Sequence, residues 1–398
     1  MSNLDSKDTI EKNSLDVQNI VLSEDKCNKH GRLDFLKNKK SNLKINAQLI
    51  KRLAKDQELS KENHLLIDRI IKSLELKGEM PFPWTPQEEH YLQKEPQNIW
   101  LDYIIYRFKF TMYPAEKVVS DFPIYILIEP ISVCNLRCVM CYQVDKTFTT
   151  KPYMGMMDMK LFRNCIDQAV DGGTQAITLG SRGEPTLHPK ISKMLDYMSG
   201  KFMEVKLITN ATKLNEQLCH DILKSDVHLL VFSVDAHTKD VYEEIRVRAK
   251  FDEIYNNIKQ FHEIRDRYYP DSKINTRISA VLVRDDQDPD AFTEFWGKIV
   301  DEVSAKNASF RWDTYTNKVH PNINGPCWLL WERLYVWWDG ATNPCDADYK
   351  SKLSPGNIKE NSIRDIWHGE KLTELRRKHL NNMRKEYNPC DRCGLNFD

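Results

Sequence analysis

Short apolar runs alternate with amphipathic stretches through the middle of the chain, between residues 121 and 315. The apolar runs have the length of buried strands, and the stretches between them carry helical spacing. The runs are YILIEPI, AITLG, EVKLITNA, LLVFSVDA, INTRISAVLV and ASFRWD, and the helical stretches lie near MDMKLFRNCIDQAV, KISKMLDYMS and NEQLCHDILK. This alternation predicts an α/β core with a parallel sheet, open or partly closed as a barrel. Such folds bind ligands at the C-terminal ends of their strands.

The pattern differs on both sides of this core. Residues 1–60 are polar and poor in aromatics, which predicts a disordered or loosely helical tail. Residues 61–120 have helical spacing, with a helix start at Thr85, and predict a helical N-terminal extension. Residues 316–398 contain a Trp-rich segment with an Asp-Gly turn, which indicates a hairpin, and end in a cysteine-containing tail. We therefore expect two folded appendages around the central core.

The amino-acid composition says more about the cellular environment of the protein than about its binding partner. Lys plus Arg and Asp plus Glu each total 58, so the net charge does not favour nucleic acid or an anionic membrane. No apolar run approaches the roughly 20 residues that cross a bilayer, and the polar N-terminus does not read as a signal peptide. We expect a cytoplasmic protein without membrane contact. Its ten cysteines then favour metal binding or catalysis over disulfides.

Three cysteines directly follow the first predicted strand, in the segment EPISVCNLRCVMCYQ. Cys134, Cys138 and Cys141 can hold three irons of a four-iron, four-sulfur cluster and leave the fourth iron open for a small chelating molecule. The alternatives are a zinc site or three unrelated buried thiols. A C-x3-C-x2-C loop after the first strand of a strand-helix series resembles the radical S-adenosylmethionine (SAM) superfamily. The resemblance covers residues 121–398 and implies a partial (β/α)6 TIM-like barrel.

The resemblance also implies a SAM site along the strand ends. Within ITLGSRGEPTLHP, Gly183 and Glu184 are similar to the last two residues of the family's Gly-Gly-Glu motif, while Arg182 replaces the first glycine. The other residues it implies around SAM are Met140, Asn210, Ser233, Asp235 and Arg246. Each also has a plainer interpretation, since turn glycines before proline, polar strand ends and a solvated arginine on a helix are common without any ligand.

Four further cysteines lie after residue 219: Cys327, Cys345, Cys390 and Cys393. Four thiolates complete one iron-sulfur cluster with no open position, but the same pattern is equally that of a four-thiolate zinc site. The surrounding sequence resembles the SPASM/twitch domain of radical SAM enzymes. This resemblance implies one auxiliary [4Fe-4S] cluster in a small α+β domain, because full SPASM domains usually carry about seven cysteines.

The resemblance predicts an oxidoreductase or epimerase that cleaves SAM to a 5'-deoxyadenosyl radical and abstracts hydrogen from its substrate. We expect a carbohydrate-like small molecule, such as a sugar or aminocyclitol, and a flavodoxin or ferredoxin-type electron donor. An epimerase needs a hydrogen donor, for which Cys165 and Cys219 in predicted helices are the candidates, although both read first as core residues. The alternatives are a maturase of ribosomal precursor peptides and a non-catalytic iron-sulfur or zinc-binding protein.

Overall fold

The computed structural model describes residues 32–36, 43–55, 57–308, 313–316, 319 and 325–393. One sheet of nine strands runs through the described chain in the order β1-β7-β6-β5-β4-β3-β2-β8-β9. Cys27 lies outside the described residues.

Six strands of the central region pair in parallel, each with its neighbour in sequence. They are β2 (Tyr125–Ile128), β3 (Ala176–Leu179), β4 (Glu204–Thr209), β5 (Leu229–Ser233), β6 (Asn275–Leu282) and β7 (Glu302–Asn307). The predicted α/β fold with a parallel sheet is confirmed. All strand C-termini therefore point to one end of the sheet, which is where the cysteine loop begins.

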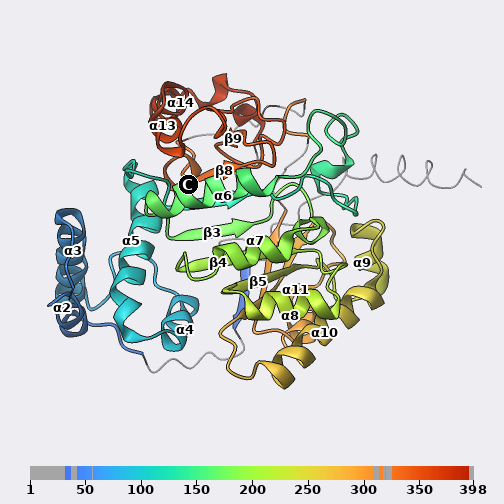
Figure 1. Ribbon diagram of the computed structural model, residues 1–398, viewed down its shortest axis with the longest axis horizontal. Coiled ribbons are helices and arrows are strands. Elements are labelled where there is room, and N and C mark those ends of the chain that lie inside the picture. Colours follow the sequence, from blue (N-terminus) through green and yellow to red (C-terminus); the bar gives the residue numbers. More distant parts are fainter. Residues whose placement is uncertain are drawn as a thin grey trace, which may run out of the picture.

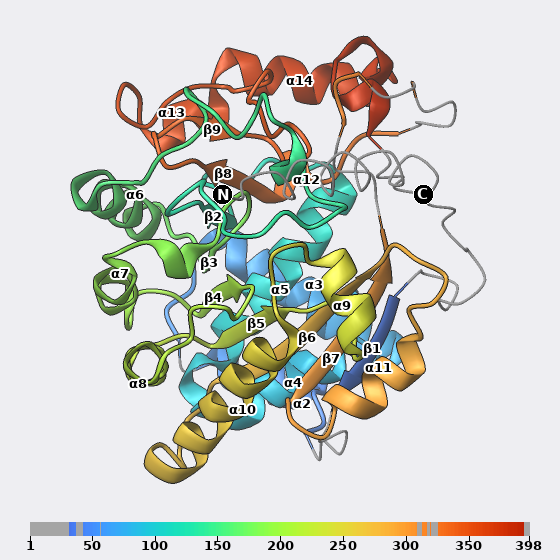
Figure 2. The ribbon, with the colours of Figure 1, turned by 90° about the vertical axis from the view of Figure 1, so that its right-hand side faces the viewer.

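Helices connect these strands and cover the sheet, as Figures 1 and 2 show. They are α6 (Met159–Asp171), α7 (Ile191–Met198), α8 (Glu216–Lys224), α9 (Lys239–Ile245), α10 (Phe251–Tyr268) and α11 (Pro289–Trp296). Side-chain caps fix where several of them begin. Asp158, for example, accepts hydrogen bonds from the backbone N–H groups of Lys160 and Leu161 at the start of α6. The apolar faces of these helices and strands form the main hydrophobic core.

The prediction for the last strand of this series falls largely outside the described residues, and the structure has a strand just before it. We expected a strand within ASFRWD at 308–313, whereas β7 ends at Asn307 and residues 309–312 lie outside the described part. β7 is hard to recognise in the sequence because it contains buried polar residues. Glu302, only 3% exposed, pairs with Arg277 of β6, so a charged side chain occupies an interior position.

The N-terminal part adds a helical layer. It contains α2 (Ala47–Lys55), α3 (Lys61–Lys77), α4 (Pro86–Lys94), the short η2 (Gln97–Ile99) and α5 (Trp100–Glu116). The predicted helix start at Thr85 is confirmed by a capping box with Glu88. Within the segment predicted as a tail, α2 buries Ile50, and β1 (Arg32–Leu36) pairs antiparallel with β7. This part of the segment is thus integrated into the fold.

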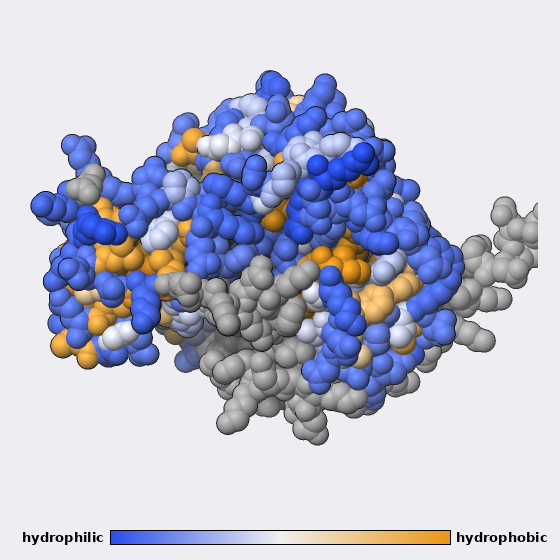
Figure 3. Space-filling model, turned by 90° about the horizontal axis from the view of Figure 1, so that it is seen from below, coloured by the Kyte–Doolittle hydropathy of each residue, from blue (hydrophilic) through white to orange (hydrophobic). Residues whose placement is uncertain are grey.

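The outer surface of this layer is partly apolar. Figure 3 shows apolar side chains gathered at the left, over the helical extension. Leu65 and Leu76 of α3 are 65% and 73% exposed. None of the described helices is both long and apolar enough to cross a membrane.

The C-terminal region extends the same sheet. β8 (Arg333–Val336) pairs in parallel with β2, and β9 (Thr342–Asn343) pairs antiparallel with β8, which agrees with the predicted hairpin. The remaining elements cap this end of the molecule at the top of Figures 1 and 2. They are α12 (Leu329–Glu332), α13 (Ile363–His368), α14 (Glu370–Leu380), η5 (Arg384–Glu386) and η6 (Cys390–Arg392).

Candidate cluster and SAM site

The loop after β2 holds the three cysteines of the first constellation. Cys134 and Cys141 are half-buried and Cys138 is buried, and the Cys141 N–H donates to the Cys138 carbonyl at 2.9 Å. Burial raises the pKa of the Cys134 thiol, and the neighbouring Cys138, Glu184 and Cys141 raise it further. The three thiols of the loop therefore lie near enough to interact electrostatically.

Backbone hydrogen bonds anchor this loop to the segment between α9 and α10. The Arg137 N–H donates to the Val247 carbonyl at 3.0 Å, and the Val139 N–H donates to the Ile245 carbonyl at 3.0 Å. These two bonds flank Cys138 on both sides. A segment more than 100 residues away in sequence thus fixes the path of the cysteine loop.

Gly183 lies against the cysteine loop at the end of β3. A Cβ atom added at this position would lie 2.0 Å from the Ile131 carbonyl oxygen, so any larger residue forces the backbone apart. The next residue, Glu184, donates its backbone N–H to the Val133 carbonyl at 3.0 Å. A glycine is therefore required here because two loops approach each other closely. A turn by itself would not require one.

The Glu184 side chain joins the ends of β3 and β4. Its carboxylate accepts hydrogen bonds from the Thr209 hydroxyl at 2.7 Å, the Asn210 N–H at 2.7 Å, and the N–H and hydroxyl of Thr186 at 3.1 and 2.6 Å. Burial raises the pKa of this carboxyl group, while these donors lower it. Glu184 is 3% exposed and holds the strand ends together. The short helix η4 (Pro185–Leu187) follows it.

Arg182, which replaces the first glycine of the motif, turns away from the cysteines. Its guanidinium forms a two-bond ion pair with Glu129, with both distances 2.6 Å, and also donates to the Tyr349 carbonyl at 2.8 Å. It lies 4.0 Å from the ring centroid of Trp337. The substitution thus connects β2 and the β3 loop to the C-terminal region.

Asp235 and Arg246 form a second buried ion pair. Asp235, which follows β5 with a positive φ of 74°, is 1% exposed, and its Oδ2 accepts from the Arg246 Nε at 2.7 Å. Its other oxygen accepts from the Val281 N–H at 2.8 Å. Arg246 is thus neither a solvated helix residue nor free of partners, and the pair holds the segment that anchors the cysteine loop.

The remaining predicted SAM residues lie at the same end of the sheet. Asn210 directly follows β4, and its amide lies 3.9 Å from Cys134 Sγ and donates to Asn135 Oδ1 at 3.0 Å. Ser233 is the last residue of β5, and the partly buried Met140 packs against the main core. The fold brings all these residues to the strand ends around the cysteine loop, although their contacts with SAM remain predictions.

The four C-terminal cysteines come together from three separate segments. Cys327 precedes α12, Cys345 follows β9, Cys390 is the first residue of η6, and Cys393 follows η6 directly. Burial raises the pKa of Cys345, and the nearby thiols of Cys390, Cys393 and Cys327 raise it further. Segments separated by about 60 residues thus bring their thiols near one another.

Both thiol groups have the chemistry of iron-sulfur ligands. Iron-sulfur clusters are held by thiolates, and all seven cysteines of the two groups are free thiols. Around the first group, the Leu136 N–H lies 3.4 Å from Cys134 Sγ, a contact of the kind that tunes such clusters. Within the described chain, no three His, Cys, Asp or Glu side chains are arranged to hold a single metal ion.

The two candidate hydrogen donors lie elsewhere. Cys165 of α6 and Cys219 of α8 are both 0% exposed and belong to the main hydrophobic core between helices and sheet. Burial raises the pKa of each thiol to about 12. Their surroundings agree with the simpler interpretation as core residues.

Sequence reasoning missed two buried polar residues that organise the site. Glu129 was read as part of an apolar run, and Gln143, in η3 (Tyr142–Val144), donates to the carbonyls of Ser132 and Arg182 at 2.7 and 2.6 Å. The signal for Glu129 was present, since a charged residue at the end of an apolar strand needs a buried partner. No pattern in the sequence points to Gln143.

Two family models match the chain. The radical SAM superfamily model matches residues 128–293, and the SPASM model, described as an iron-sulfur cluster-binding domain, matches residues 327–394. Together they cover more than half of the chain. Their boundaries enclose the two thiol groups described above.

Curated relatives match over shorter stretches. A tungsten-containing aldehyde ferredoxin oxidoreductase cofactor-modifying protein of Pyrococcus furiosus is 31% identical over 112 residues, 28% of this chain and 30% of the relative. The mycofactocin maturase MftC of Mycobacterium ulcerans is 27% identical over 131 residues, 33% and 34% of the two chains. These alignments span about a third of each relative's length.

Solved structures share the fold. Streptococcus suis SuiB bound to SAM has a TM-score of 0.53 and 15% identity, over 84% of this chain and 83% of SuiB. The enzyme anSMEcpe with bound SAM has a TM-score of 0.50 and 16% identity, over 68% and 85% of the two chains. With its family models, thiol groups and fold in agreement, the chain belongs to the radical SAM superfamily, with a C-terminal SPASM domain, a SAM-binding [4Fe-4S] cluster and auxiliary iron-sulfur binding.

Proposed function

We propose that this protein is a radical SAM oxidase that removes hydrogen from a small carbohydrate-like substrate. The observation that carries the proposal is the pairing of two thiol groups with different chemistry. Three thiols share a loop at the strand C-termini, and four others converge in the C-terminal region. The first set leaves an iron open for SAM, whereas the second is complete and suits electron transfer.

Cys134, Cys138 and Cys141 would hold the SAM cluster. When bound, this cluster supplies the electron that cleaves SAM to methionine and the 5'-deoxyadenosyl radical, which takes a hydrogen atom from the substrate. The protein would bind SAM along the backbone at Gly183 and beside Met140. Its contribution is to position the reactants and to exclude water.

The other predicted SAM residues would act in two ways. Ser233 and Asn210 have polar groups at the strand ends that can contact SAM. Glu184, Asp235 and Arg246 are engaged with the protein, and we propose that they mainly position the loops around SAM.

The outcome of the reaction follows from where the spare thiols lie. An epimerase returns a hydrogen atom to the substrate, yet Cys165 and Cys219 are enclosed in the hydrophobic core. Oxidation needs no such donor, because the substrate radical loses a proton and passes one electron to an acceptor. The four cysteines Cys327, Cys345, Cys390 and Cys393 would hold that acceptor as an auxiliary [4Fe-4S] cluster.

The proposal includes a location and an electron source. Thiolate-bound clusters persist in a reducing compartment, which favours the cytoplasm. The electron for SAM cleavage would come from a flavodoxin or ferredoxin-type protein. If the acceptor cluster returned its electron to the SAM cluster, each turnover would be redox-neutral and this donor would be needed mainly to start the reaction.

A second candidate is the maturation of a ribosomal precursor peptide. It is favoured by the names of relatives, since MftC is a maturase and SuiB has been solved bound to its precursor peptide SuiA. Against it, the described N-terminal extension consists mainly of helices, and α4 lines the N-terminal ends of the strands rather than the end that carries the cysteines. The small-molecule substrate therefore remains our first candidate.

An anaerobic reconstitution tests the central proposal. Wild type loaded with iron and sulfide should hold about eight irons per chain, and the Cys134→Ala/Cys138→Ala/Cys141→Ala variant about four. With SAM and dithionite, only wild type should form 5'-deoxyadenosine. Zinc in place of iron, or a fully loaded protein that does not cleave SAM, would contradict radical SAM catalysis.

Isotope transfer then separates the two substrate classes. A substrate deuterated at its reacting carbon delivers deuterium to 5'-deoxyadenosine. Transfer from a deuterated sugar or aminocyclitol, with a ketone or aldehyde as product, would support the oxidase. Transfer only from a precursor peptide would favour the maturase.

A further inference from the structure

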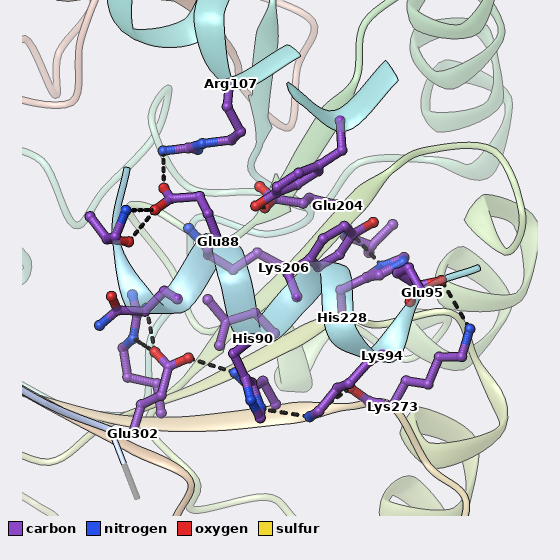
Figure 4. A pocket seen from close by; sticks show the side chains of 18 of the residues that line it. Glu88, His90, Lys94, Glu95, Arg107, Glu204, Lys206, His228, Lys273 and Glu302 are labelled. Carbon is purple, nitrogen blue, oxygen red and sulfur yellow. Dashed lines mark hydrogen bonds and ion pairs between the residues drawn. The ribbon is translucent and has the colours of Figure 1, made fainter. Parts of the chain in front are cut away.

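A cavity of about 320 Å³ lies at the opposite end of the sheet from the cysteine loop. Its floor is formed by the first residues of four strands, including Glu204 and Lys206 of β4 and Arg277 of β6. Helices α4 and α5 form its other walls (Figure 4). Radical SAM chemistry takes place at the strand C-termini, so this cavity is separate from the site proposed above.

Most charged groups in this cavity have partners. Arg107 pairs with Glu88 at 2.7 Å, and Lys273 pairs with Glu95 at 2.9 Å. Arg277 pairs with Glu302. These pairs neutralise three of the positive charges that line the cavity. They also leave the remaining positive charges as the groups available to a ligand.

The fourth lining carboxylate, Glu204, is engaged by tyrosines. The hydroxyls of Tyr103 and Tyr106 donate to its two oxygens at 3.1 and 3.0 Å. The Tyr103 ring stacks on Tyr91, with 4.1 Å between the ring centroids. The cavity wall beside Glu204 is therefore aromatic. The Tyr103 and Tyr106 hydroxyls already donate their hydrogen bonds to this carboxylate.

Lys206 is the exception. Among the described residues, its ammonium group has no hydrogen bond and no carboxylate within ion-pair distance, although it lines the cavity. Figure 4 shows it near the middle of the charged residues. Burial and the nearby Arg277 lower the pKa of Lys206 and Glu204 raises it, with a net result of about 8. Lys206 is half-buried, and an ammonium group without an ion pair or hydrogen bond is available to an anion supplied from outside the protein.

A second lysine reinforces the excess of positive charge. Lys94 donates to the Asn275 side-chain oxygen at 3.0 Å and to the Lys273 carbonyl at 3.4 Å, but it forms no ion pair in the described chain. Both of its partners are neutral groups. The lining therefore combines two cations that lack carboxylates with aromatic walls, which suits a small organic anion.

We propose that this cavity is a binding site for the oxyanion group of a small molecule, a carboxylate or a phosphate, with Lys206 as the charged anchor. The ammonium group donates to the oxyanion, and Lys94 contributes a second positive charge. The tyrosines contact the apolar part of the ligand. Because α4 and α5 close the cavity against the sheet, occupancy stabilises the packing of the helical extension on the core.

A titration on the reconstituted protein tests this site. Sodium phosphate and sodium acetate are added separately at constant ionic strength, balanced with sodium chloride, and the unfolding midpoint and the heat of binding are recorded. One of the two anions should bind saturably, with a Kd on the order of 1 mM, and raise the midpoint. The anion that binds identifies phosphate or carboxylate chemistry.

Two variants locate the effect. Lys206→Met should weaken binding by about tenfold or more, since it removes the anchoring charge while keeping the side-chain length. Lys250→Met, which removes an exposed lysine paired with Glu243 on α9, should bind as wild type does. Binding that is absent in wild type, non-saturable, or equal in wild type and Lys206→Met would overturn the proposal. SAM cleavage measured in parallel is expected to be unaffected, so the test is independent of the oxidase proposal.

Discussion

At the scale of single residues, the SAM side of the fold depends on polar groups that contact the protein. Glu184 receives four hydrogen bonds from donors on the β3 loop and the end of β4. Gly183 allows the neighbouring backbone to approach the cysteine loop. A motif that the family resemblance implies for SAM binding is thus also the joint between two strands and the cluster loop.

Changing Glu184 to Gln should lower the free energy of unfolding by about 2 kcal/mol. The amide keeps one acceptor oxygen. Its NH₂ group, however, faces N–H and hydroxyl donors whose hydrogen bonds the second carboxylate oxygen accepts in wild type. Chemical denaturation measures the loss, and SAM affinity should fall with it because the β4 end is released. Glu216→Gln, an exposed change on α8, serves as the control. Unchanged stability would show that the four hydrogen bonds contribute no net energy.

Lys206 gives a prediction about pH. Its pKa is lowered from 10.5 to about 8, so the penalty of burying its charge is fully present below pH 8 and disappears as pH rises towards 10.5. In anion-free buffer, Lys206→Met should therefore be more stable than wild type by about 2 kcal/mol at pH 7. The difference should shrink as pH rises from 8 to 10. Denaturation curves across this range measure it, and a variant less stable than wild type at pH 7 would contradict a desolvated, uncompensated lysine.

At the scale of elements, buried ion pairs connect parts of the chain that are distant in sequence. The Arg182 and Glu129 pair joins the β3 loop to the end of β2 and, through Tyr349, to the C-terminal region. The Asp235 and Arg246 pair holds the segment that anchors the cysteine loop. Both pairs lie within the parallel sheet's C-terminal end, where the function requires the most defined geometry.

Arg182→Met should lower the free energy of unfolding by about 3–5 kcal/mol, because it leaves Glu129 buried without a counter-charge. The double variant Glu129→Gln/Arg182→Met should recover most of this loss. Urea denaturation gives both values. Arg377→Met, which breaks an exposed pair with Glu374 on α14, should change stability by less than about 0.5 kcal/mol. A double variant as unstable as the single one would show that the contacts of Arg182 with Trp337 and Tyr349 matter more than its charge.

The strands and helices of the core could be predicted because their patterns are local. Apolar runs identified β2 to β6, and helical spacing with caps identified α4 and α6. β7 was not predicted, because Glu302 is polar yet buried and its partner Arg277 lies 25 residues away. Local patterns cannot reveal such pairs, and neither can they show that β8 joins β2 in the sheet.

The candidate site, too, could be predicted only in part from the sequence. The positions of the cysteines in the sequence predicted two thiol groups, and the fold brings each group together. The roles of Asp235 and Arg246 could not be derived, since a carboxylate and an arginine at strand ends can contact either SAM or each other. The cavity around Lys206 was also missed, because the alternation in EVKLIT only indicates a polar face.

At the scale of the whole molecule, the two ends of one parallel sheet carry different chemistry. The strand C-termini carry the cysteine loop and lie beside the C-terminal region, which β8 attaches to β2. The strand N-termini carry the charged cavity closed by the helical extension. This separation means that changes at one end can be tested without altering the residues of the other.

The last prediction uses this organisation to test the role of the C-terminal thiols. Cys390→Ser/Cys393→Ser should lower the iron content from about eight to about four per chain. If these thiols hold the electron acceptor, SAM cleavage should continue to within about twofold, while oxidised product falls to background. Product and 5'-deoxyadenosine are quantified together, with a thermal melt to show that the variant is folded and Cys27→Ser as the control. If SAM cleavage also stops in a folded variant, the C-terminal region contributes to the SAM site itself; if oxidised product persists, the substrate radical passes its electron elsewhere.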